Sequence, residues 1–348
     1  MNIQNLIRPV IKALKPYSSA RDEFQGNSDA MVFLDANENP YNNGVNRYPD
    51  PQQKNVKALL SKIKGIPVKQ ILLGNGSDEV LDLIFRAFCE PNQDNVISLP
   101  PTYGMYEVLA NLNAVEIRKV NLSEDDFQPK VDTILAATDA HSKVLFLCSP
   151  NNPTGNSFSN GSVLKLLKGF KGLVVIDEAY IDFSTEKSWL TRLEEFPNLV
   201  ITQTLSKAYG MAGIRLGICY ASEEILKVLN TIKPPYNVNE LSQKKAIELL
   251  NDKDLASVQI KSILEERTRL ISDLATISFV SKIYPSDANF ILAKVDDATK
   301  RYNQLVERGV VVRNRTTQFG CENCLRFTVG TKEENEELIK NLLLISKS

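Results

Sequence analysis

Two polar clusters, each placed directly after an apolar run, contain side chains that could take part in one reaction. Asp177 closes the run LVVID, and Tyr180 follows three residues later. Lys207 lies thirty residues after Asp177, just behind the run LVITQT, and Arg215 follows eight residues after Lys207. The hydroxyl groups of the same segment belong to Thr204 and Ser206. If both runs are parallel strands, their carboxyl ends meet at the edge of the sheet where α/β proteins bind ligands.

Pyridoxal phosphate requires this set of side chains. Its aldehyde needs a lysine amine, and a free amine has a pKa of about 10.4, so the site must favour the neutral or imine form. Its ring nitrogen must stay protonated, which a buried carboxylate enforces. Its phosphate carries more charge than the roughly half charge of one helix N-terminus can match, so a cation is needed as well. We therefore predict pyridoxal phosphate as the cofactor, with Lys207 holding it as a Schiff base.

Each of these residues alone also has a purely structural interpretation. An Asp at the end of a strand is often a cap or an ion-pair partner, and a lysine is usually solvated. Tyr48 and Tyr103 lie beside prolines and could be packed aromatics. The combination at these spacings favours the cofactor site.

The elements that must position these residues are visible as apolar runs separated by helical patterns. Near-continuous runs suit strands that are buried on both faces of a parallel sheet. Residues 77–88 place five apolar side chains on one helical stripe, with Ser77 as the expected N-cap. Three helical patterns follow Ser222, and a last helix begins with a capping box of Thr331 and Glu334. The predicted strands lie at 95–99, 115–120, 143–148, 173–177, 199–204, 217–221, 288–295 and 324–330.

The sequence therefore predicts an α/β fold with a large domain, built on a mostly parallel central sheet flanked by helices, and a smaller α+β domain. We expect residues 1–45 to form an N-terminal arm and part of the small domain. Residues 46–250 are expected to form the large cofactor-binding domain, and residues 251–348 the small C-terminal domain.

Composition narrows the class of protein. The 348 residues carry a formal net charge of −1, so no overall field favours nucleic acid or an anionic membrane. No apolar run approaches the length of a bilayer span, and the N-terminus lacks a secretion signal, so we expect a cytoplasmic protein.

Five cysteines do not suit a disulfide framework, and the C-x-x-C of Cys321 and Cys324 lacks a second ligand pair for zinc. His141 is the only histidine and lies in a polar stretch, which excludes Ser-His and Cys-His catalysis.

The motifs SPNNPTG, DEAY and TLSKAYGMAGIRLG resemble the signature segments of fold type I aminotransferases. This resemblance implies that Asp177 pairs with the ring nitrogen of the cofactor and that Lys207 moves the proton between substrate and cofactor. It also implies that Asn152 and Tyr180 donate to the phenolate oxygen and that Tyr103 stacks on the ring. The cofactor phosphate would be bound by the segment from Gly76 to Asp78, mainly through Ser77 and Asp78, and by Thr204, Ser206 and Arg215.

Further motifs, among them NENP, NRYP, PPTYGMY and CLRFTVGT, resemble the histidinol-phosphate aminotransferases along the whole chain. The resemblance implies reversible amino transfer between glutamate and imidazole-acetol phosphate, which gives 2-oxoglutarate and L-histidinol phosphate in histidine biosynthesis. Tyr48 would reach the cofactor phosphate of a neighbouring subunit, which implies a homodimer with shared sites. Arg326 would bind a substrate carboxylate or other anionic group, and Arg313 and Tyr17, with Asn152, would lie at the substrate.

Three alternatives remain open on the sequence. A threonine-phosphate decarboxylase also binds a phosphorylated amine, and spacing does not fix which bond of the substrate breaks. An aromatic amino-acid aminotransferase would share the cofactor site but would not need Arg313. A binding module that keeps the cofactor without turnover would normally carry a DNA-binding segment, and no helix-turn-helix pattern precedes the site.

Overall fold

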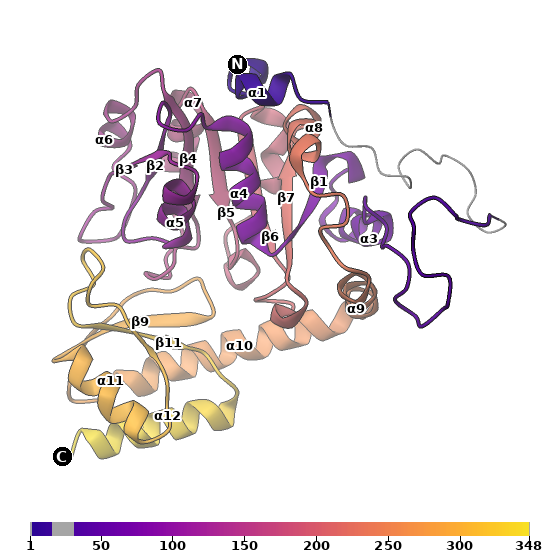
Figure 1. The fold of residues 1–348 in the computed structure, drawn as a ribbon. Coiled ribbons are helices and arrows are strands. Elements are labelled where there is room, and N and C mark those ends of the chain that lie inside the picture. The colour runs from indigo at the N-terminus through magenta and orange to yellow at the C-terminus, as the bar shows by residue number, and fades with distance from the viewer. Residues whose placement is uncertain (1, 16–30, 348) are drawn as a thin grey trace.

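The computed structural model describes residues 2–15 and 31–347, and Tyr17 therefore lies outside the described residues. Two sheets organise this part of the chain (Figure 1). A seven-stranded sheet with helices around it makes up the upper part of the view, and the second sheet lies below it with the C-terminal helices.

The large sheet has the strand order β1-β7-β6-β5-β4-β2-β3. The five strands β2 to β6 run parallel, whereas β7 is antiparallel to both β6 and β1. Because the chain moves outward from β2 to β3 and then returns to β4, the strand order reverses between β2 and β4, a place where doubly wound sheets bind ligands. The strands span Ile71–Asn75 (β1), Asn95–Ser98 (β2), Glu116–Lys119 (β3), Ser142–Cys148 (β4), Leu173–Asp177 (β5), Leu199–Thr204 (β6) and Leu216–Ala221 (β7).

Alternate residues of these strands pack into two separate cores. Along β4, Val144 and Phe146 belong to one core, whereas Leu145 and Leu147 belong to the other. The first core is covered by α4 (Ser77–Phe88), α5 (Met105–Leu112) and α8 (Glu223–Ile232). The second is covered by α3 (Lys54–Lys64), α6 (Val131–Ala136), α7 (Asn160–Gly169), α9 (Glu240–Asn251) and the 3-10 helix η5 (Trp189–Glu195). Helices on both faces explain why these strands are almost continuously apolar.

The small sheet is antiparallel in the order β10-β11-β9-β8 and is covered on one face only by helices. Its strands are Val280–Ile283 (β8), Phe290–Val295 (β9), Arg313–Asn314 (β10) and Cys324–Thr328 (β11). Leu325 and Phe327 pack against α10 (Lys253–Leu274), α11 (Ala298–Glu307) and α12 (Lys332–Ile345). Cys324 and Leu292 instead join the core of the large sheet, so the uncovered face of the small sheet is turned toward the large one.

Short helices complete the described elements. The 3-10 helices are η1 (Ile3–Asn5), η3 (Val68–Gln70), η4 (Ile181–Phe183) and η6 (Ala212–Ile214), and α1 spans Pro9–Lys12. Ile3 and Ile7 are buried beside α4 and α8, and Arg8 pairs with Glu90 at 3.2 Å. This stretch therefore packs on the large sheet, and the domain assigned to residues 1–45 stays a prediction.

The predicted α/β class with a smaller α+β part is confirmed. Each of the eight predicted strands overlaps an observed one, and the capping box of α12 is formed by Thr331 and Glu334 as predicted. Ser77, however, is the first helical residue rather than the N-cap, which is Gly76. The edge strand β3 is half exposed rather than buried on both faces. Strands β1, β8 and β10 were not anticipated by the apolar runs.

We propose that the boundary between the large and the small domain lies at Asp252, where α9 ends and α10 begins. Asp252 caps α10 through a bond from the amide of Leu255 to its Oδ1 at 3.1 Å. Helix α10 then runs below the large domain in this view, along the small sheet (Figure 1).

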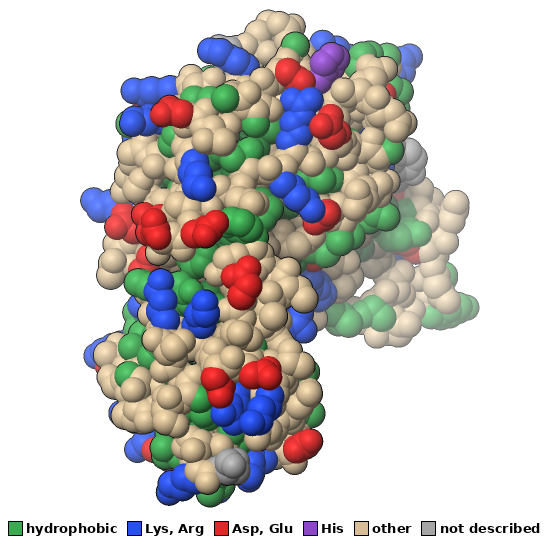
Figure 2. Space-filling view, turned by 90° about the vertical axis from the view of Figure 1, so that its left-hand side faces the viewer, with side chains coloured by type: hydrophobic (Ala, Val, Ile, Leu, Met, Phe, Trp, Pro, Cys, Tyr) green, Lys and Arg blue, Asp and Glu red, His purple; other side chains and the backbone are tan. Residues whose placement is uncertain are grey.

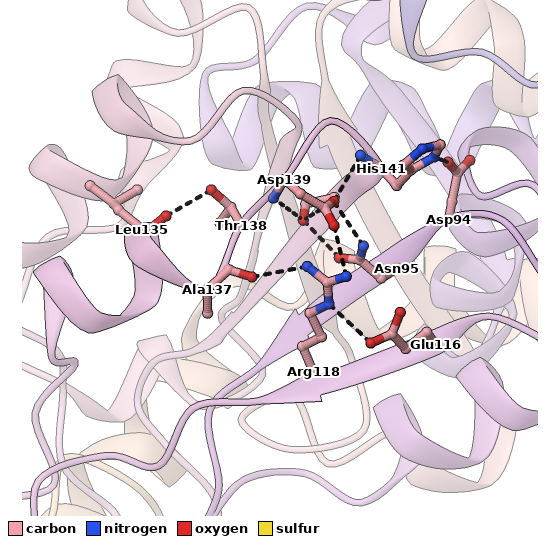
Figure 3. A network of polar contacts seen from close by, with 10 residues as sticks. Asp94, Asn95, Glu116, Arg118, Leu135, Ala137, Thr138, Asp139 and His141 are labelled. Carbon is pink, nitrogen blue, oxygen red and sulfur yellow. Dashed lines mark hydrogen bonds and ion pairs between the residues drawn. The ribbon is translucent and has the colours of Figure 1, made fainter.

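A polar network ties together the amino ends of β2, β3 and β4, at the edge of the sheet opposite the carboxyl ends (Figure 3). Asp139 accepts from Asn95 at 3.0 Å and pairs with Arg118 at 2.7 Å, and these bonds hold its pKa well below the usual range. His141 lies beside Asp94, with Nδ1 and Oδ1 3.4 Å apart, and its side chain is largely exposed, which agrees with the loop histidine expected from its polar surroundings. We assign this network a structural role.

Charged side chains of both signs are mixed over the surface rather than gathered by sign on the face shown in Figure 2. Among the described residues, no helix has the length and apolar character that crossing a bilayer requires.

Candidate active site

A cavity of about 510 Å³ lies where the carboxyl ends of the parallel strands face the small sheet. The large domain contributes the first turn of α4 and the loops after β2, β4, β5 and β6, and the small domain contributes β10, β11 and the loop between them. The structure thus brings together in one cavity twelve of the residues that the sequence singled out: Ser77, Asp78, Tyr103, Asn152, Asp177, Tyr180, Thr204, Ser206, Lys207, Arg215, Arg313 and Arg326.

Asp177 ends β5 and is almost fully buried. The hydroxyl of Tyr106 donates to its Oδ2 at 2.8 Å, and the amide of Ala179 donates to its Oδ1 at 3.2 Å. Burial raises the pKa of Asp177, while the hydrogen bond from Tyr106 opposes that rise. A buried carboxylate of this kind is stabilised in its charged form by a protonated ligand nitrogen.

Lys207 follows β6, and its side chain is open to the cavity. Partial burial lowers the pKa of Lys207, and the nearby Arg326 lowers it further, whereas Asp177 opposes the change. Both main causes favour the neutral amine, which is the nucleophilic form. Lys207 Nζ lies 5.7 Å from the centre of the Tyr180 ring.

Two tyrosines line the cavity near Asp177 and Lys207. The hydroxyl of Tyr103 donates to Asp78 Oδ1 at 3.0 Å, and its ring meets that of Tyr106 edge to face at 5.7 Å. Tyr180 packs edge to face on Phe290 of β9 at 5.1 Å, a contact between the large and small domains. Burial raises the pKa of both phenols, so each keeps its proton and can donate it in a hydrogen bond.

The turn before α4 forms a cradle beside Arg215. Gly76, at φ +83°, has no side-chain cap, so the first N–H groups of α4 lack that partner. A Cβ at Gly76 would lie 2.8 Å from the guanidinium of Arg215, and a Cβ at Gly217 would lie 2.3 Å from the amide nitrogen of Ser77. The Gly76 amide donates to the Arg215 carbonyl at 2.8 Å. A helix N-terminus next to a guanidinium is a site for a phosphate group.

At the small-domain side, Arg326 donates through Nη1 to Asn152 Oδ1 at 2.5 Å. This bond uses the acceptor of the Asn152 amide and leaves its NH₂ group as the remaining donor. The guanidinium of Arg326 lies 5.0 Å from the centre of the Phe290 ring. Arg313 is directly opposite Arg326 in the ladder of β10 and β11, so both side chains project from the same face.

Tyr48 is not part of this cavity within one chain. It is half exposed, stacks on Tyr236 with ring centres 4.4 Å apart, and lines a separate pocket with Glu38 and Leu241. Tyr17 lies outside the described residues.

Sequence reasoning missed five residues that line or support the site. Tyr106 lies in the quoted motif PPTYGMY, but its role depends on a bond to Asp177, 71 residues away. Thr102 and Cys148 could have been found as neighbours of a predicted strand end. Arg315 and Gln318 lie in the stretch where the resemblance is least specific, and only their charge and polarity pointed to a ligand.

The cavity, the carboxylate at its base, the amine beside it and the phosphate cradle together fit pyridoxal phosphate, and with the two-sheet architecture they define a pyridoxal-phosphate-dependent enzyme of fold type I. The family described as Aminotransferase class I and II matches residues 25–342. The chain belongs to this family of pyridoxal-phosphate-dependent transaminases and, within it, to the histidinol-phosphate aminotransferases.

The latter assignment rests on similarity over almost the whole chain. The chain is 68% identical to a histidinol-phosphate aminotransferase of Flavobacterium johnsoniae, over 99% of each sequence. A solved histidinol-phosphate aminotransferase of Sinorhizobium meliloti in complex with pyridoxal-5'-phosphate matches with a TM-score of 0.79 at 23% identity, over 86% of this chain and 83% of the other. A threonine-phosphate decarboxylase of Porphyromonas gingivalis matches with a TM-score of 0.72 at 23% identity, over 86% and 93%. These two structures show the fold alone.

Proposed function

We propose that the protein transfers an amino group reversibly between L-histidinol phosphate and 2-oxoglutarate, giving imidazole-acetol phosphate and glutamate, in histidine biosynthesis. The observation that carries this proposal is the presence of Lys207 and two guanidinium groups, of Arg313 and Arg326, in one cavity. A substrate whose amino group reaches Lys207 would then place an anionic group among the arginines. The name of the relative from Flavobacterium johnsoniae supports the same substrate.

When bound, pyridoxal phosphate supplies an aldehyde that takes up the amino group and a ring that withdraws electrons from the adjacent carbon. We assign Lys207 Nζ to hold the cofactor and then to remove and return the proton at the substrate carbon that carries nitrogen. Asp177 would hold the ring nitrogen protonated, and Asn152 and Tyr180 would donate to the phenolate oxygen. Tyr103 would stack on the ring.

The phosphate group of the cofactor would be bound in the cradle described above. The amides of Ser77 and Asp78 would donate to it from the N-terminus of α4, and Arg215 would supply the full positive charge. The hydroxyls of Thr204 and Ser206 would complete its hydrogen bonds. Binding the phosphate in this cradle would hold the cofactor beside Lys207.

We propose further that the enzyme works in the cytoplasm as a homodimer in which Tyr48 binds the cofactor phosphate of the partner subunit. Tyr48 is half exposed, and the segment around it exposes many large hydrophobic side chains, which marks an interaction surface. These side chains are Met31, Val32, Leu34, Tyr41 and Val45. Tyr17, together with Arg313, would bind the substrate phosphate.

A substrate comparison tests the reaction. The purified protein with added pyridoxal phosphate is offered histidinol phosphate, phenylalanine or O-phosphothreonine, each with 2-oxoglutarate, while glutamate and carbon dioxide are measured. We expect glutamate to form fastest with histidinol phosphate and no carbon dioxide to be released from phosphothreonine. Release of carbon dioxide would make the protein a decarboxylase, and a preference for phenylalanine would make it an aromatic aminotransferase.

A further inference from the structure

Arg315 adds a third guanidinium group to the substrate end of the cavity, beside those of Arg313 and Arg326. The backbone explains this placement. The amide of Arg315 donates to the carbonyl of Cys324 at 2.9 Å, which continues the antiparallel ladder in which Arg313 is opposite Arg326. Because side chains alternate along a strand, Arg313 and Arg315 project from the same face, and Arg326 projects from that face as well.

These three cations have no anionic partner in the described part of the chain. No ion pair between described residues involves any of them, and the Nε atoms of Arg315 and Arg326 are buried without a hydrogen-bond acceptor. Burial, together with Arg326 and Arg313, lowers the pKa of Arg315 to about 10. A cluster of like charges with unused donors is unfavourable unless an anion enters it.

We propose that Arg315 is a specificity-determining residue that binds the phosphate group of the phosphorylated amine substrate, together with Arg313 and Arg326. A carboxylate carries one negative charge and is matched by a single guanidinium. A phosphate monoester carries a charge of about −1.5 to −2 and three acceptor oxygens, so it can use several guanidinium forks at once. The third arginine therefore favours a phosphate over a carboxylate in this subsite.

Gln318 supports the same location for the substrate. Its side chain lines the cavity three residues after Arg315, and its Oε1 is buried without a donor. The amide of Gln318 donates to the carbonyl of Arg315 at 2.9 Å, so the two residues belong to one turn. A substrate held by Arg315 would thus lie beside Gln318 Oε1, an acceptor that has no donor among the described residues.

This inference rests on the proposed function, and it is tested with the cofactor-loaded protein and the variants Arg315→Gln, Arg315→Lys and Arg308→Gln. Arg308 is exposed at the end of α11 and does not line the cavity, so Arg308→Gln is the matched control. We expect Arg315→Gln to raise the KM for histidinol phosphate about 10- to 100-fold, because the substitution removes one charge-assisted hydrogen bond to the substrate. Arg315→Lys should recover part of this loss, because it restores charge without the planar fork.

Two comparisons separate recognition of the phosphate from a general defect. Activity with unphosphorylated L-histidinol and the KM for glutamate should stay within about 3-fold of the unaltered enzyme in Arg315→Gln. An equal loss with all three substrates, or no loss with histidinol phosphate, would overturn the proposal. The visible spectrum of the bound cofactor should be the same in all variants.

A binding measurement keeps the two proposals separable. If the unaltered enzyme does not use histidinol phosphate, the proposed function fails, and the affinity of the cofactor-loaded protein for inorganic phosphate then decides the role of Arg315. Weaker phosphate binding by at least about 10-fold in Arg315→Gln, but not in Arg308→Gln, supports the phosphate site. Equal phosphate affinity in both variants rejects it.

Discussion

At the scale of single residues, position decides what a side chain does more than its type. Asp177 and Glu178 are neighbouring carboxylates, both buried, and burial raises the pKa of each. Asp177 lines the cavity, whereas Glu178 is enclosed by donors from Ser188 at 2.5 Å and Gln203 at 2.9 Å. The first is available to a ligand and the second holds the loops together.

Sequence alone could find Asp177 and Lys207, because each closes an apolar run and belongs to a specific motif. It could not find the bond between Tyr106 and Asp177, since nothing local relates two residues so far apart in the chain. It could not show that Arg315 lies on the same face as Arg313 either. Their shared face depends on the pairing of β10, a strand of only two residues that no apolar pattern marks.

The variant Tyr106→Phe tests whether the hydrogen bond from the Tyr106 hydroxyl keeps Asp177 charged. The hydrogen bond from Tyr106 opposes the rise in the pKa of Asp177, so removing the hydroxyl raises that pKa further. Below its pKa the carboxyl is neutral and no longer holds a protonated ring nitrogen. We expect the acid side of the pH–activity profile to move upward by about one unit, from a hydrogen bond to a charged group of about 1.5 kcal/mol.

The control is Tyr302→Phe on α11, which does not line the cavity. Its pH profile should match that of the unaltered enzyme. A profile for Tyr106→Phe that moves downward, or does not move, would contradict the role given to Tyr106.

At the scale of elements, the apolar runs predict well which strands are buried, but they do not predict the direction in which each strand runs. The runs that became β6 and β7 are equally buried, yet β7 is antiparallel to its neighbours. Apolar content reports how much water a strand excludes, not which way it runs. The apolar runs do not indicate strand β1, because its end carries Gly74 and Gly76, which suggest a turn. In the structure Gly74 lies close to Val80 of α4, and Gly76 lies close to Arg215 and to Gly217 of β7.

Gly217→Ala tests that close contact. The added Cβ would lie 2.3 Å from the backbone of Gly76 and Ser77, so β7 and the cradle must separate. We expect a loss of stability of at least about 1–3 kcal/mol, as for overpacking, and weaker retention of the cofactor. Thermal unfolding and dialysis against cofactor-free buffer measure the two effects.

Gly213→Ala, four residues earlier, is the matched control because a Cβ there meets nothing within 4 Å. It should change stability by no more than about 0.5 kcal/mol. Equal behaviour of the two variants would mean that the cradle tolerates a side chain.

At the scale of the whole molecule, the site exists because two sheets meet. The uncovered face of the small sheet places Arg313, Arg315 and Arg326 opposite the strand ends that hold Asp177 and Lys207. Periodicity predicted both parts but not how they face each other, since that depends on contacts such as Tyr180 on Phe290. The proposed dimer belongs to the same scale, because Tyr48 lies outside the cavity of its own chain.

Mixing two inactive variants tests the shared site. In a dimer of Tyr48→Ala and Lys207→Ala, one site contains an intact Lys207 together with the partner's Tyr48, and the other contains neither. We expect activity to appear after the variants are unfolded and refolded together, although each alone is nearly inactive. Refolding each variant alone is the control, and no gain on mixing would mean that Tyr48 does not serve a partner subunit.

The central claim is that Lys207 drives amino transfer from a phosphorylated amine, and a single-turnover experiment tests it most directly. The cofactor-loaded enzyme is mixed with histidinol phosphate while the visible spectrum and the remaining amine are followed. The account predicts that one equivalent of amine per site is consumed and that consumption continues only when 2-oxoglutarate is added. Lys207→Ala should slow this step by at least about 10²- to 10⁴-fold. Consumption by Lys207→Ala at the normal rate, or no consumption by the unaltered enzyme, would contradict the account.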